Sequence, residues 1–509
     1  MPEVSQDRQR DTEILAAGNN SDDSIRLNSL ALLIDFGSTY TKVVAVDLRT
    51  SEVVGRGQAA STVNTDVRQG LVQALVTLHE NRALFDARPA GLRVLEDKLV
   101  LASSSAAGGL RMAVIGLVPG LTVEAANTAA LGAGAKVVGA WSFKLAEKAI
   151  VEIEAQRPDM ILLTGGTDGG DSATILHNAH LLSRSTLSVP IVVAGNQNVA
   201  GEVCDILTNS GKDVRSTSNV MPRSGQLAVE AAREEIRTLF MERITHAKGL
   251  DGISGLVPVI LPTPMAVLKG AFLGAEGTVQ EKGWGDMVVV DVGGATTDVH
   301  SIGYGQLQGP TFIEQGLPEP FAKRTVEGDL GIRFNAGTLL DRVGVQAFVQ
   351  KFRAAFLEFD VSGDEIAAYV DAVSQETSRI PREHWQSAVD AELARIAVDL
   401  AVERHVGKKE RIVTREGETW VHYGKDLSEA RTLIGTGGVF IYNSYVAHIL
   451  SPATDSDRHY EVLRPKNPRI FVDSSYLLYA VGLLLQNEPD VALRMFKKNM
   501  RPLDDRQAN

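Results

Sequence analysis

The chain has 509 residues, of which 44% are hydrophobic and 22% are charged, and its formal net charge is −12. This length favours two or more domains, and the composition is that of a soluble globular protein with a large core. The acidic balance argues against nucleic acid or an acidic membrane as a partner. Cys204 is the only cysteine, which excludes an intramolecular disulfide and cysteine-based metal sites and fits the cytoplasm.

The two ends of the chain are polar. Residues 1–28 contain no cationic stretch followed by an apolar one, so we expect a disordered leader rather than a signal peptide. No apolar run approaches the roughly 18 residues of a membrane-spanning helix, so we expect no contact with a membrane. Residues 491–509 are expected to form a C-terminal tail.

The first half of the chain alternates between strand and helix patterns. Residues 32–48 predict two strands around a short turn, residues 52–63 a third strand, and residues 67–80 a helix. Further along, 158–171 and 189–198 are short apolar strands that end in glycine-rich polar loops. Such strands are typical of a parallel sheet buried on both faces.

The second half begins after a segment rich in glycine and proline, residues 248–271, which predicts a passage between two domains. Residues 287–303 again predict strand, turn and strand. Residues 336–405 are expected to be mostly helical, and the charged residues 406–427 are expected to form a β-hairpin arm. A buried helix is expected near 475–486.

Two of the predicted hairpins share one arrangement. The stretches "LLIDFGSTYTKVVAVDL" and "DMVVVDVGGATTDVHSI" each place an aspartate at the end of an apolar strand, before a turn of small and hydroxyl residues. Such turns present backbone N–H groups and hydroxyls to phosphate oxygens. The phosphate-binding residues that we expect are Gly37, Ser38 and Thr39 in the first turn, and Gly293, Gly294, Thr296 and Thr297 in the second.

The aspartates of these hairpins, Asp35, Asp291 and Asp298, would repel phosphate unless a cation lies between them. A hydrated Mg²⁺ ion fits, because it retains several waters and takes only one or two carboxylates directly. The same carboxylates could orient an attacking water. Lys42 follows the first turn and adds a positive charge, and we assign it no catalytic role.

A third glycine-rich turn follows an apolar strand near residue 434. Its residues Gly435, Thr436, Gly437 and Gly438 would let an adenosine moiety pack against the backbone. A single turn of this kind is more often only a strand connection. Two similar hairpins 256 positions apart, together with this later loop, favour a nucleotide site.

In chain order, "IDFGSTYTKVVAVD", "VVVDVGGATTDVHSI" and "LIGTGGVF" resemble the first phosphate, second phosphate and adenosine motifs of the actin, heat-shock chaperone and sugar-kinase ATPase superfamily. The resemblance implies an α/β fold of two lobes, each a mixed β-sheet of ribonuclease-H-like topology flanked by helices. ATP and Mg²⁺ would bind in the cleft between the lobes. It also implies that Asp291 positions water, that Asp298 contacts Mg²⁺ through water, and that Asp35 faces the magnesium and phosphates.

On this basis, we expect the first ATPase lobe at 29–265, with an inserted α/β segment. The second lobe is expected at 266–490 and would contain a mostly helical insertion and the adenosine loop.

The stretches "SSAAGGLRMAVIGLVPGLTVEAANTAALGAGAKV" and "PDMILLTGGTDGGD" are similar to the glutamate mutase L family of accessory proteins for adenosylcobalamin-dependent mutases. This resemblance implies a slow Mg²⁺-dependent ATPase that acts as a reactivating chaperone for a mutase such as glutamate mutase. A small-molecule kinase of the same superfamily is one alternative, although no general base near an acceptor hydroxyl is evident. The other is an actin-like nucleotide-switched scaffold. Filaments formed with ATP would favour the scaffold, whereas monomers or dimers would not; a homodimer is one candidate assembly.

Other polar residues have two interpretations. Asp168 and Asp171, in the glycine-rich loop 164–171, could join the cleft or a partner surface, or they could hold the backbone of their own turn. His177 and His180 lie three residues apart on a predicted helix, but they lack a third ligand. A helix packed in a core is therefore favoured over a metal site.

Overall fold

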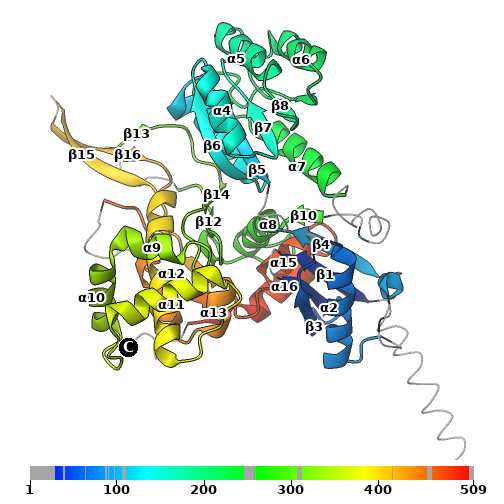
Figure 1. Ribbon diagram of the computed structural model, residues 1–509, viewed down its shortest axis with the longest axis vertical. Coiled ribbons are helices and arrows are strands. Elements are labelled where there is room, and N and C mark those ends of the chain that lie inside the picture. The colour runs from blue at the N-terminus through cyan, green and yellow to red at the C-terminus, as the bar shows by residue number, and fades with distance from the viewer. Residues whose placement is uncertain are drawn as a thin grey trace, which may run out of the picture.

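The computed structural model describes residues 29–503, except for 38–39, 63–64, 86–88, 90, 97, 106–109, 246–256, 258–259, 306–311, 415–416 and 455–460. The expected leader, and Ser38 and Thr39 of the first turn, lie outside the described residues. Figure 1 shows three parts of the chain: a first lobe that contains the N-terminal strands, a second lobe that contains most of the C-terminal half, and an insert.

The first lobe is built on a five-stranded sheet. In spatial order, its strands are β10 (Ile260–Pro262), β4 (Leu99–Ser104), β1 (Leu30–Phe36), β2 (Tyr40–Asp47) and β3 (Glu52–Ala60). Strand β2 is antiparallel to both of its neighbours, whereas β1, β4 and β10 are parallel. The expected helix is α2 (Val67–Asn81), which packs its apolar face on this sheet.

The second lobe repeats this arrangement. In spatial order, its strands are β14 (Ala322–Glu327), β12 (Thr297–Ile302), β11 (Met287–Val292), β17 (Thr432–Thr436), β18 (Arg469–Val472) and β19 (Arg501–Pro502). Strand β12 is antiparallel to both neighbours, and β11, β17 and β18 are parallel. Five strands of each sheet thus have the same order and directions, which is the ribonuclease-H-like topology. The predicted two-lobed α/β fold is confirmed.

Two helices cross between the lobes. Helix α8 (Thr263–Glu276) follows β10 of the first sheet but contacts β11 and β12 of the second. Helix α15 (Leu478–Leu484) follows β18 of the second sheet but contacts β1 and β4 of the first. Together with α16 (Pro489–Asn499), they form one apolar core that includes side chains from both sheets (Figure 1). This core joins the lobes at one end and fixes how the strand ends face one another.

The insert, residues 111–245, lies between β4 and β10. Its strands form a parallel sheet in the order β6 (Lys136–Ser142), β5 (Arg111–Gly116), β7 (Met160–Leu163), β8 (Ile191–Val193) and β9 (Val214–Ser216). Helices α3 (Glu124–Gly132) and α7 (Glu230–Thr245) cover one face, and α4 (Glu147–Ala155), α5 (Ala173–Ser183) and α6 (Ala200–Asn209) cover the other. The expected parallel strands are confirmed, and this doubly wound unit has a core of its own.

The expected helical region and β-hairpin arm are also present in the second lobe. The helices are α9 (Ala336–Val343), α10 (Val345–Ala355), α11 (Gly363–Gln375) and α12 (His384–His405), followed after the adenosine loop by α13 (Gly438–Tyr442) and α14 (Val446–Leu450). Strands β15 (Lys408–Thr414) and β16 (Gly417–Tyr423) form the arm, beside β13 (Phe312–Gln315). Among the described residues, no helix is both long and apolar enough to cross a membrane.

The contact between α8 and α15 depends on glycine. A Cβ atom on Gly482 would lie 1.8 Å from the carbonyl oxygen of Ala266, and one on Gly270 would lie 2.3 Å from that of Leu478. An added side chain would push the two helix backbones apart and so disturb the core that both helices share. We therefore predict that Gly482→Ala lowers the free energy of unfolding by about 2 kcal/mol or more, measured as a fall in the thermal midpoint.

The matched control is Gly201→Ala on helix α6, where an added Cβ meets no atom within 4 Å. We expect this variant to equal the wild type or to gain up to about 1 kcal/mol, because alanine has the higher helix propensity. Equal stability of the two variants would contradict the role assigned to the α8–α15 contact.

Candidate functional site

The two aspartate hairpins have the same register. In the first, Asp35 pairs with Lys42 across β1 and β2, and the turn spans residues 37–40. In the second, Asp291 pairs with Asp298 across β11 and β12, and the turn spans residues 293–296. The glycine N–H that opens each turn donates to the carbonyl three residues later, at 3.0 Å and 2.9 Å. The hairpins are therefore structural copies in which Lys42 and Asp298 hold equivalent positions.

Asp35 lies at the buried end of β1, with 2% of its surface exposed. Its Oδ1 accepts hydrogen bonds from the hydroxyls of Thr263 at 2.7 Å and Ser103 at 3.1 Å. Its Oδ2 lies 3.9 Å from the Nζ of Lys42. Two hydroxyls and one ammonium thus orient this carboxylate, which explains how a buried strand tolerates a charge.

Asp291 is half-buried at the end of β11. Desolvation, followed by repulsion from Asp298, raises the pKa of its carboxyl to about 7; the charges of Asp473 and Asp35 act in the same direction, and that of Lys42 opposes them. A carboxyl that titrates near neutral pH can accept a proton from a bound water. This environment fits the expected water-positioning role.

Asp298 is buried and paired with a cation that the sequence did not indicate. Its Oδ2 accepts from the Nη2 of Arg324 at 2.9 Å and from the Nε at 3.3 Å. The other oxygen, Oδ1, is buried and has no hydrogen-bond partner among the described residues. Arg324 thus holds one oxygen, and among the described residues the other has no partner, so it could contact a bound group.

Tyr476 contributes to the same region from the loop before α15. Its ring centroid lies 3.9 Å from the Nζ of Lys42, a cation–π contact. Burial, and then the negative charges of Asp291 and Asp35, raise the pKa of its phenol. Its backbone φ of +50° is uncommon for a residue other than glycine. The carboxylates of the two lobes therefore act on one shared phenol.

The adenosine loop leaves β17 through buried Gly435 and Thr436 and reaches an exposed glycine. Gly437 has a φ of +110°, and a Cβ there would lie 2.3 Å from the carbonyl oxygen of Val292 in the second hairpin. Only glycine fits this position. A Cβ on Gly438, in contrast, would meet no atom within 4 Å, so open space lies beside this backbone.

Asp473 is a functional candidate that the sequence prediction missed. It is fully buried, accepts from the Thr436 hydroxyl at 3.0 Å, and accepts from the backbone N–H of Leu477 and of Leu478 at the start of α15. Burial raises the pKa of this carboxyl. The signal that could have found it is the stretch "VDSSYLLYA", an aspartate and serines just before an apolar helical run. Asp473 ties the adenosine loop to the crossing helix.

The segment after β14 supports the second phosphate turn. The Thr297 hydroxyl donates to the carbonyl of Leu330 at 2.7 Å, so it has a protein partner, as that of Thr436 does. The N–H of Ile332 donates to Gly293 O, and those of the next two residues donate to Gly294 O. The carbonyls of Gly293 and Gly294 are therefore both hydrogen-bonded to the segment after β14, which holds the backbone of the turn in place.

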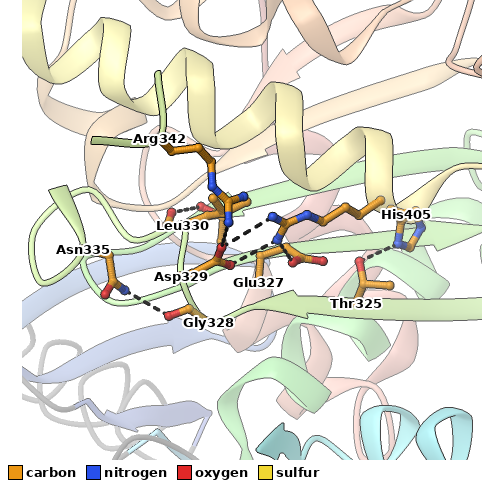
Figure 2. Close-up of polar contacts among 10 residues, drawn as sticks. Thr325, Glu327, Gly328, Asp329, Leu330, Asn335, Arg342 and His405 are labelled. Atoms are coloured by element: carbon orange, nitrogen blue, oxygen red, sulfur yellow. Dashed lines mark hydrogen bonds and ion pairs between the residues drawn. The ribbon is translucent and has the colours of Figure 1, made fainter. Parts of the chain in front are cut away.

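An ion-pair network fixes this supporting segment in turn, as Figure 2 shows. Arg404 of α12 pairs with Glu327 and with Asp329, the latter at 3.1 Å. Arg342 of α9 reaches Asp329 at 2.9 Å. The helical region thus holds the chain that underlies the second turn.

The glycine-rich loop 164–171 belongs to the insert. Asp168 Oδ1 accepts from the N–H of Gln197 at 3.0 Å and from the Asn219 amide at 2.8 Å, while Asp171 Oδ1 accepts from the N–H of Thr174. These bonds agree with the second interpretation, in which both carboxylates hold turn backbone. His177 contacts the carbonyl of Leu145, as expected for a packed helix.

The carboxylates of the two hairpins fit a hydrated magnesium ion that is held through its waters. Over the described part of the chain, no three His, Cys, Asp or Glu side chains form a metal-binding group. The buried, unpartnered Oδ1 of Asp298 could accept from a metal-bound water. Asp35, which is equivalent in position to Asp291, offers a carboxylate from the first lobe.

The strand order of both sheets and the matched hairpins define the two-lobed fold of actin-like and sugar-kinase proteins. The chain matches the family model described as MutL protein over residues 31–500, and it belongs to the MutL family. The curated "Protein MutL" of Clostridium tetanomorphum is 42% identical over 473 residues, which cover 92% of this chain and 98% of that protein.

Similarity to solved structures is more distant. Gluconate kinase from Lactobacillus acidophilus is 9% identical, with a TM-score of 0.33, over 94% of this chain and 95% of that one. Plasmodium falciparum glycerol kinase with ADP is 10% identical, also with a TM-score of 0.33, over 94% and 95%. The fold assignment rests on the strand order of the two sheets, not on these scores.

The raised pKa of Asp291 predicts a pH-dependent cost in stability. The folded protein binds the Asp291 proton more tightly than the unfolded chain does. The contribution of this proton to the free energy of unfolding is therefore fully present below about pH 4 and is lost as the pH rises through about 7. Asp291→Asn stays neutral at every pH. Its stability relative to the wild type should therefore increase between pH 5 and pH 8, by about 1–3 kcal/mol.

Thermal midpoints of both proteins, measured without nucleotide and with EDTA, provide this comparison. Other titrating groups cancel, because they are common to the two proteins. A difference in midpoint that stays constant across this pH range would show that Asp291 does not titrate there.

Proposed function

We propose that the protein binds Mg-ATP between its lobes, hydrolyses it slowly, and uses the resulting movement to reactivate an adenosylcobalamin-dependent mutase such as glutamate mutase. The observation that carries the nucleotide part is the pair of matched hairpins, which place Asp35 and Asp291 at equivalent positions in the two lobes. The proposed lobes are residues 29–265 and 266–490, and the second lobe is completed by α16 and β19, which lie largely within residues 491–509 that were expected to form a tail. The proposed place of action is the cytoplasm.

The phosphates would lie between the turns at 37–40 and 293–296, with adenosine against Gly437 and Gly438. Asp291, which has a pKa of about 7, would orient a water and accept its proton. Magnesium, when bound, supplies positive charge to the phosphate oxygens. Asp35 and Asp298 would hold its waters through carboxylate oxygens, and Lys42 would offset the negative charge of the first hairpin.

The chaperone part rests on family membership and on the architecture. The chain belongs to the MutL family, and its sequence resembles accessory proteins of such mutases. Two lobes joined at one end by α8 and α15 can rotate about that joint when nucleotide binds or leaves. The insert has its own core and would carry such a rotation to a bound mutase subunit.

Gly438 tests where adenosine binds. Because a Cβ at this position meets no protein atom, Gly438→Ala should leave the thermal midpoint of the nucleotide-free protein unchanged. It should weaken ATP binding at least about 10-fold by calorimetry, since the methyl group would occupy the space of the ligand. Gly201→Ala, the control on helix α6, should bind ATP as the wild type does. Unchanged affinity in Gly438→Ala would exclude this loop as the adenosine site.

Asp291→Asn tests the chemistry. The amide cannot accept the proton of the attacking water, so hydrolysis should fall about 100-fold or more. ATP affinity should stay within about 3-fold, because this group acts in the transition state and not in binding. Turnover by a phosphate-release assay and affinity by calorimetry separate the two effects. Hydrolysis at the wild-type rate would refute the assigned role.

The same variant tests the proposed function. With ATP, the wild type should restore activity to a glutamate mutase that was inactivated during turnover, whereas Asp291→Asn should bind the mutase without restoring it. Pull-downs with ATP and with ADP should differ for the wild type. Failure of the wild type to bind or restore the mutase would refute the chaperone role, while leaving the nucleotide site open to its own tests.

A further inference from the structure

One guanidinium joins the candidate nucleotide site to the insert. Arg324 lies on β14, opposite His300 of β12, and only 2% of its side chain is exposed. Its Nη2 and Nε donate to Asp298 Oδ2. Its Nη1 donates to the carbonyls of Ala135, at 3.1 Å, and Leu131, at 3.3 Å, at the end of helix α3.

The acceptors on the insert suit a cation. The last carbonyls of a helix lack intrahelical partners and carry the negative end of the helix dipole. The Leu131 carbonyl lies in the last turn of α3, where it also accepts from the N–H of Gly134, and the Ala135 carbonyl follows the helix end. Arg324 therefore bridges a carboxylate of the second lobe and two carbonyls of the insert, and loss of Arg324 would leave Asp298 buried without its cation.

The insert is connected covalently only to the first lobe, through the segments that follow β4 and precede β10. Its α3 nevertheless packs against β14 of the second lobe. A small crevice between them is lined by Arg233 and Gly132 of the insert and by Lys323 and Arg324 of β14. The insert thus bridges both lobes, and any rotation of the lobes must change the contact around Arg324.

We propose that Arg324 is a positioning residue that couples the orientation of Asp298 to the place of the insert. When α3 rests on β14, Arg324 holds Asp298 Oδ2, so that the unpartnered Oδ1 keeps one direction in the cleft. When the insert is displaced, Arg324 loses two of its acceptors, and the carboxylate loses its fixed orientation. A partner that moves the insert therefore changes the rate of hydrolysis, and nucleotide changes the position of the insert.

This inference rests on the proposed nucleotide site, and its test separates the two. Arg324→Gln removes the charge that joins Asp298 to α3. Arg324→Lys keeps the charge but offers a single donor group. The matched control is Arg233→Gln, because Arg233 lines the same crevice and donates to Thr128 O on α3 but has no contact with Asp298.

Steady-state hydrolysis provides the first measurement. Arg324→Gln should lower kcat about 10-fold or more. It should also raise the Mg²⁺ concentration that gives half-maximal activity, because Asp298 is assigned to the waters of the bound ion. Arg324→Lys should recover part of kcat. Arg233→Gln should match the wild type. Wild-type kcat in Arg324→Gln, or an equal loss in Arg233→Gln, would overturn the inference.

Amide hydrogen exchange provides the second measurement, and its protection pattern in the nucleotide-free state also shows whether each variant is folded. In the wild type, Mg-ATP should change the exchange of peptides that cover residues 131–137, and this response should disappear in Arg324→Gln. Calorimetric binding of ATP to the wild type with no response in these peptides would overturn the coupling while leaving the nucleotide site intact. Absence of ATP binding would instead refute the site.

Discussion

Buried negative charge at the junction of the lobes is the constraint on which the structure depends. Asp35, Asp298 and Asp473 are buried near the strand ends of the two sheets, and Asp291 is half-buried beside them. Like charges in such an environment repel strongly. Lys42 and Arg324 neutralise part of this charge, and Asp473 is stabilised by the backbone at the start of α15. Desolvation, followed by the negative charge that remains, raises the pKa of Asp291, and this charge favours a cation with the ligand.

The duplicated topology explains how this charge was assembled. Both sheets bring a hairpin to the same end of a parallel strand, and the crossing helices α8 and α15 turn these ends toward one another. The two hairpins differ in charge at one equivalent position, where the first has Lys42 and the second has Asp298. The first hairpin therefore contains its own counter-ion, whereas the counter-ion of the second, Arg324, comes from β14. Because Arg324 also donates to Ala135 O, it connects the insert to the second hairpin.

The sequence was sufficient for the hairpins and the glycine-rich loops, because these features are local, and the two-lobed class was implied by the resemblance of these motifs to a known superfamily. An apolar strand that ends in Asp and Gly is visible in a window of a few residues, and its repetition 256 positions later needs no structure. Arg324 and Tyr476 could not be predicted in this way. Their roles depend on contacts with residues far away in the chain, such as Ala135 and Lys42, and nothing in their local sequence marks them. Asp473 was predictable in part. Its position before an apolar helix indicates a helix cap, but its contact with Thr436 depends on the fold.

The central claim is that the two hairpins enclose one Mg-ATP between the lobes. A structure determined with Mg²⁺ and a non-hydrolysable ATP analogue tests it most directly. The account predicts one nucleotide per chain, with its phosphates between the turns at 37–40 and 293–296 and its adenosine against Gly438. A nucleotide bound elsewhere, or one that contacts only one lobe, would contradict it.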